Sequence, residues 1–184
     1  MTYPFQWLSP ILQWVALVLS LVGTLFFAKK LDTQGASLKN DVAPYNIVSL
    51  ELAWNGARSQ EIIDSWNITG LQDTAKKQLH LDFAFIVFYP IFLSLSCAIL
   101  SRHVSDMLTL IGVVLTWSAL AAGILDVVEN VLIFHMIESG VTNLVSRLTT
   151  LSAGLKFALI FSVFGYWFVS LLQWILSVLQ SFGK

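Results

Sequence analysis

The sequence is poor in charged residues. Only 11% of its 184 residues are Asp, Glu, Lys or Arg, whereas a soluble domain carries about 25%. Hydrophobic residues make up 57%, so too few polar side chains remain to cover a surface that faces water. Ten basic and eleven acidic residues give a net charge of -1, which is unlike the basic surface of a nucleic-acid-binding protein. The composition indicates a membrane protein with no nucleic-acid partner.

Cysteine and catalytic motifs are scarce too. A single cysteine, Cys97, excludes an internal disulfide and any CxxC redox or zinc site. The chain contains no GxSxG, HExxH or Walker-type lysine loop. No set of His, Cys and carboxylate residues has a spacing diagnostic of a metal site, so no metal is expected and no cofactor is identified.

Four apolar stretches are long enough to cross about 30 Å of hydrocarbon as helices. They cover residues 10–28, 81–100, 107–136 and 151–179. Each must be helical, because lipid offers no partner for open backbone groups. The sequence therefore predicts an all-α fold, a four-helix transmembrane bundle that forms a single membrane domain over residues 1–184.

Residues 29–80 form a connection much longer than the usual link between helices of a bundle. Apolar residues gather between Ile47 and Trp54 and again between Ile62 and Trp66, and the turn signal Asn55-Gly56 separates the two groups. This pattern predicts two short amphipathic interfacial helices, near residues 45–54 and 57–66. Their apolar faces would lie on the bilayer or on the bundle.

Basic residues are concentrated on the side of the membrane that carries this connection. The opposite side holds only Arg102 and Lys184. The positive-inside rule therefore predicts a cytoplasmic connection. The same connection carries six acidic residues, so its charges also fit an ordinary water-exposed segment. The basic residues on its side are Lys29, Lys30, Lys39, Arg58, Lys76, Lys77 and Arg147.

The third apolar stretch carries small and polar residues on one helical face. Successive members are four and three residues apart, which keeps them aligned on a helix. Small residues on such a face let helices approach closely in a membrane. We interpret the face as a helix-packing surface that turns polar at one end. Its members are Gly112, Thr116, Ala119, Gly123, Asp126 and Asn130.

The polar end of this face is the main candidate site. Glu129 lies beside Asp126 and Asn130 on the same surface. Asp82 begins the second stretch and Lys156 lies near the start of the fourth, both on the side where the third stretch ends. The connectivity therefore predicts one polar layer near one membrane interface, covered by the long connection.

The layer has two interpretations. A buried charge is tolerated when it is paired, so Lys156 could form a structural ion pair with Glu129 or Asp126. Alternatively, charged residues within a span can mark a functional site, here for a lipid headgroup, a small ligand or a metal. His80 and His135 lie near the same level and could join the carboxylates as ligands.

Three segments resemble an uncharacterised group of bacterial four-span integral membrane proteins with no assigned activity. They are residues 47–53 (IVSLELA), residues 81–85 (LDFAF) with Tyr89, and residues 126–130 (DVVEN). The resemblance implies a four-helix fold in a bacterial inner membrane. It also implies that six residues belong together: Glu51, Asp82, Tyr89, Asp126, Glu129 and Asn130.

The expected function is that of an accessory subunit or a ligand- or lipid-binding module, because a packing face is present and catalytic signatures are missing. Expected partners are the lipid bilayer and other membrane subunits or further copies of the chain. The alternative is a small intramembrane enzyme or lipid-modifying protein that uses Asp126 and Glu129 with Asp82. Such an enzyme would need one protonated and one ionised carboxyl group.

Overall fold

The structure, a computed structural model, describes residues 2–182 and is helical without strands over this range. Lys184, which the charge count places opposite the long connection, lies outside the described residues. The elements in chain order are α1 (Pro10–Gly35), the 3₁₀ helix η1 (Ala36–Leu38), α2 (Ile47–Glu51), α3 (Gly56–Ile68), α4 (Gln72–Leu100), α5 (Asp106–Ser139) and α6 (Asn143–Phe182).

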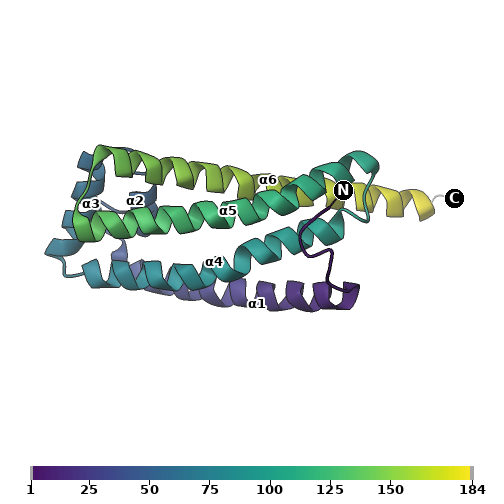
Figure 1. The fold of residues 1–184 in the computed structure, drawn as a ribbon, viewed down its shortest axis with the longest axis horizontal. Helices are drawn as coiled ribbons and strands as arrows, with labels where there is room; N and C mark the ends of the chain where they lie inside the picture. Colours follow the sequence, from purple (N-terminus) through teal and green to yellow (C-terminus); the bar gives the residue numbers. More distant parts are fainter. Residues whose placement is uncertain (1, 183–184) are drawn as a thin grey trace.

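Four helices, α1, α4, α5 and α6, are long and apolar enough to cross a membrane. They run side by side along the long axis of the molecule (Figure 1). α1 packs along α4, α4 along α5, and α5 along α6. The short helices α2 and α3 lie at the end where α5 turns into α6, and the α4–α5 turn lies at the other end (Figure 1). The polar residues of α5 near α2 are thus far from the α4–α5 turn.

The long helices continue beyond the apolar stretches of the sequence. α1 runs through Lys29 and Lys30 to Gly35, and α4 begins at Gln72, so residues 72–80 extend the second apolar stretch as helix. α6 begins at Asn143 rather than at residue 151. Lysine and glutamine are good helix formers, so a change to polar residues does not end a helix. The segment between α1 and α4 is therefore shorter than the predicted 29–80, and we refer to residues 36–71 as the cap.

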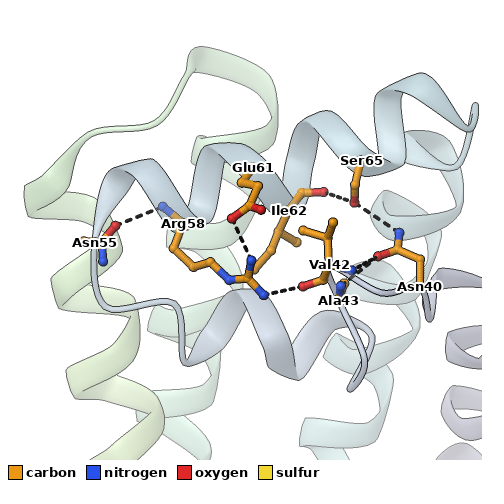
Figure 2. A network of polar contacts seen from close by, with 8 residues as sticks. All are labelled: Asn40, Val42, Ala43, Asn55, Arg58, Glu61, Ile62 and Ser65. Atoms are coloured by element: carbon orange, nitrogen blue, oxygen red, sulfur yellow. Dashed lines mark hydrogen bonds and ion pairs between the residues drawn. The ribbon is translucent and has the colours of Figure 1, made fainter.

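The cap is a folded element, held by a polar network of its own (Figure 2). Arg58 forms an ion pair with Glu61 (2.6 Å) and donates a hydrogen bond to the carbonyl of Val42. Asn40 donates to the Ser65 hydroxyl (3.1 Å) and accepts from backbone amides that follow it. These contacts tie residues 40–43 to α3, which fixes the position of α2 between them.

The cap packs on the long helices through its apolar residues. Leu50 of α2 and Ile62 of α3 belong to one buried cluster with Leu79 of α4 and Met136 of α5. The fully buried Trp66 also donates its indole N–H to the carbonyl of Leu38 (2.9 Å). The two short helices predicted in this region are present as α2 and α3, and their apolar faces lie against the long helices.

The small-residue face of α5 is buried, and neighbouring helices approach its glycines closely. A Cβ atom at Gly123 would lie 2.5 Å from Cγ of Pro90 on α4. A Cβ atom at Gly112 would overlap the Tyr166 hydroxyl of α6. The predicted role of this face in helix packing is confirmed by these contacts.

We expect Gly123→Ala to destabilise the protein. The methyl group would collide with the rigid Pro90 ring, and overpacking of this kind costs about 1–3 kcal/mol. Gly154→Ala in α6 is the matched control, since no atom lies within 4 Å of its Cβ position. Thermal unfolding in mild detergent should show a lower Tm for Gly123→Ala and an unchanged or higher Tm for Gly154→Ala. Equal Tm values in both variants would contradict the close approach of α4 and α5.

Candidate functional site

Lys156 of α6 lies at the centre of the polar layer. Its Nζ is 2.8 Å from Oδ1 of Asp126 and 2.9 Å from the carboxylate of Glu129, both on α5. The three residues are only 5%, 4% and 0% exposed, respectively. The ion pair predicted between Lys156 and an acidic residue of the third stretch is present, and it involves both acidic residues. Two carboxyl groups therefore share one ammonium group.

The cap adds a third carboxyl group, that of Glu51. The Asn46 side chain caps α2, and Glu51 ends this helix with its Oε2 atom 3.6 Å from Nζ of Lys156. Burial raises the pKa of the Glu51 carboxyl, because desolvation outweighs the attraction of the Lys156 ammonium group. The position of Glu51 next to the Lys156 ion pair therefore depends on α2, and the fold of the cap holds α2 in place.

α4 contributes Asp82 and Tyr89 to the layer. Asn130 of α5 donates a hydrogen bond to Oδ2 of Asp82 (2.6 Å), and Asp82 is half-buried. The Tyr89 ring stacks on Phe85, and its buried hydroxyl lies beside Asp126 without a hydrogen bond of good geometry. Three long helices and the cap therefore meet at one level.

A cavity of about 510 Å³ borders this layer. It lies between α1 and α6, with α4 and α5 behind it and α2 at its cap end. Polar side chains line one part, and aromatic and aliphatic side chains line the rest. The polar residues include Glu51, Gln78, Asp82, Tyr89, Asp126, Asn130 and Lys156, and the aromatic residues are Phe85, Phe92, Phe157, Phe161 and Phe164.

The structure brings together seven of the nine residues that the sequence suggests for the layer, although Glu129 lies behind the cavity wall rather than on it. His80 and His135 do not join them. His80 is exposed, with Nδ1 bound to the carbonyl of Lys76 (2.7 Å), and His135 is exposed as well. Among the described residues, no group of three or more His, Cys, Asp and Glu side chains could hold a metal ion.

Sequence reasoning does not find the aromatic wall of the cavity or the buried Gln78. The signal for the wall is present, because Phe157, Phe161 and Phe164 recur at spacings of four and three residues directly after Lys156. In a chain this rich in aromatic residues, such a spacing is equally typical of a lipid-facing stripe. Gln78 lies in a polar segment, so nothing in the sequence marks it as buried.

No protein-family model, curated protein or solved structure matches this chain.

We expect Lys156→Met to destabilise the protein by about 3–5 kcal/mol, because it leaves buried carboxylates without their cation. The triple variant Lys156→Met, Asp126→Asn, Glu129→Gln should recover much of this loss, since it removes the two carboxylates that Lys156 binds. Thermal unfolding in detergent measures both effects.

The partly exposed ion pair between Lys76 and Glu138 provides the control for this series. Its side chains are 25% and 45% exposed, so Lys76→Met should cost less than about 1 kcal/mol. A loss in the triple variant as large as in Lys156→Met would contradict the stabilising role of the buried ion pair.

Proposed function

We propose that this protein is a membrane-embedded binding module for an amphiphilic ligand or a lipid, held in the cavity between α1 and α6. The observation that carries the proposal is the division of this cavity into a carboxyl-rich part and an aromatic part. A water-soluble metabolite would make no favourable contact with the aromatic part, and a plain hydrocarbon would make none with the buried carboxyl groups. The size of the cavity falls within the usual range for ligand sites, about 300–1,000 Å³.

The helix arrangement supports entry from the side. α1 makes its extensive contacts with α4, and α6 makes its extensive contacts with α5, whereas no comparable contact joins α1 to α6 within residues 2–182. Phe161 borders the cavity and is 67% exposed. If these helices stand in a bilayer, the aromatic part of the cavity faces the acyl chains, and a lipid-like molecule reaches it without crossing water.

The enzyme alternative receives less support from the site. Asp126 and Glu129 both bind Lys156, and Asp82 accepts a hydrogen bond from Asn130. A general base must be free to take a proton from a bound substrate. Asp126 and Glu129 are instead committed to an ion pair that joins α5 to α6, which fits a structural support for a binding site better than a catalytic pair.

For the arrangement in the membrane, we propose a four-helix bundle with the cap at the cytoplasmic interface of a bacterial inner membrane. Four apolar helices and the basic residues on the cap side support the bundle and its orientation. Many large apolar side chains on the outer faces are exposed, which suits contact with lipid, with further copies of the chain or with other subunits.

The binding function is tested by native mass spectrometry of the protein released from mild detergent. We expect a copurifying small molecule or lipid that is lost in Ile160→Trp, because the larger side chain would fill the aromatic part of the cavity. Leu155→Trp is the control on the same helix, since Leu155 is exposed and does not line the cavity. A bare protein mass, or an adduct that survives Ile160→Trp, would contradict the proposal.

The orientation is tested by single cysteines in a Cys97→Ala background. Ser37 in the cap and Ser105 before α5 are both exposed and lie at opposite ends of the long helices. Ser105→Cys should react with a membrane-impermeant maleimide added outside intact bacterial cells, and Ser37→Cys should react only after lysis. Labelling of both variants from one side would refute the four-span arrangement, and a reversed pattern would refute a cytoplasmic cap.

A further inference from the structure

We infer that the ligand of this cavity is an amphiphile whose headgroup is a primary ammonium on an alkyl or acyl chain. The inference rests on the proposed binding function and specifies the chemistry of what is bound. It follows from three properties of the polar part of the cavity: its excess of carboxyl groups over cations, its buried acceptors without a hydrogen bond and its lack of a second cation.

The layer holds more carboxyl groups than cations. Lys156 lies among the carboxyl groups of Asp126, Glu129 and Glu51, with Asp82 next to them. Among the described residues that line the cavity, Lys156 is the only lysine or arginine. One ammonium group is shared by four carboxyl groups, so without a further cation some of them stay protonated to avoid unpaired charge away from water. A bound cation would favour ionisation of a further carboxyl group beside it.

Several side chains that line the cavity carry an acceptor atom without a hydrogen bond within the described residues. Oε2 of Glu51, Oε1 of Gln78 and the Tyr89 hydroxyl oxygen are buried and make no hydrogen bond. The three residues are 6%, 4% and 3% exposed, so water from the bulk does not solvate them freely. Buried acceptors of this kind are normally paired. A primary ammonium carries three N–H donors, and the side chains that carry these acceptors line one cavity.

Positive charge for an anionic headgroup is scarce at this position. The Lys156 ammonium already binds Asp126 and Glu129, and the Asn130 amide already donates to Asp82. A phosphate or carboxylate entering here would approach the carboxyl groups of Glu51 and Asp82 without a free cation to bind it. The polar part of the cavity therefore selects against anions and in favour of a cation.

The aromatic residues nearest the layer suit a cationic headgroup as well. Phe157 already lies 4.8 Å from Nζ of Lys156, measured to the ring centroid, and Phe85 stacks on Tyr89 at the border of the polar part. Aromatic faces attract ammonium groups. Farther along, Phe161 and Phe164 offer apolar contact to a chain. The order of these residues along the cavity places the ammonium headgroup at the cap end and the alkyl or acyl chain of the ligand beside α6.

The inference is tested by the Tm of the purified protein in a neutral mild detergent with added twelve-carbon probes. Dodecylammonium should bind about tenfold more tightly than dodecyltrimethylammonium, which has the same charge but no N–H donor, and more tightly than dodecanoate or dodecanol. A second titration tests an ammonium headgroup carried by a glycerophospholipid. It compares the binding of short-chain phosphatidylethanolamine with that of short-chain phosphatidylcholine. Preference for the phospholipid pair would identify an aminolipid as the source, and preference for dodecylammonium would identify a simple amine.

Two isosteric variants show whether the carboxyl groups make this selection. Asp82→Asn and Glu51→Gln should each lower the affinity for dodecylammonium by about tenfold. The control Asp73→Asn, an exposed acidic residue of α4, should leave it unchanged. Equal binding of dodecanol and dodecylammonium, lost in Ile160→Trp, would overturn the ammonium headgroup and leave the binding function standing. No probe binding of any kind would overturn both.

Discussion

The structure depends on one buried ammonium group. Lys156 stands between Asp126 and Glu129 in an interior where each charge alone would be prohibitively costly, so the three side chains can be buried only together. This requirement fixes the relative positions of α5 and α6. The small residues of α5 then set how closely α4 and α6 approach, through Pro90 and Tyr166. Charge pairing and close packing therefore act on the same face of α5.

Much of the fold follows from composition and spacing alone. The four long helices follow from four apolar stretches, and the packing face of α5 follows from the recurrence of small residues at steps of four and three. The ends of the helices do not follow from hydropathy, because residues such as Lys29 and Gln72 extend a helix as readily as apolar residues do. The sequence shows which segments can form helices within lipid. Whether a helix continues into the polar residues beyond such a segment depends on packing of the cap.

The members of the site are also largely predictable, but their surroundings are not. Connectivity alone brings Asp82, Asp126 and Lys156 to one end of the long helices, because the stretches that carry them begin or end there. The pairing within the site depends on helix rotation and on side-chain conformations that no periodicity encodes. Asp126 and Glu129 share Lys156, whereas Asp82 binds Asn130. The cavity depends on the absence of a close α1–α6 contact, and a missing contact leaves no signal in a sequence.

The cap explains why the cavity is polar at one end only. α1, α4, α5 and α6 supply apolar and aromatic side chains along most of their length, and water would enter the polar layer freely if its end stayed open. α2 closes that end and adds Glu51, while Trp66 and the Arg58 network hold α2 and α3 in place. A short helix of five residues has little stability of its own. Because the position of Glu51 is therefore maintained by the whole cap, the charge of the layer and the folding of the cap are linked, and a ligand that neutralises the layer would stabilise both.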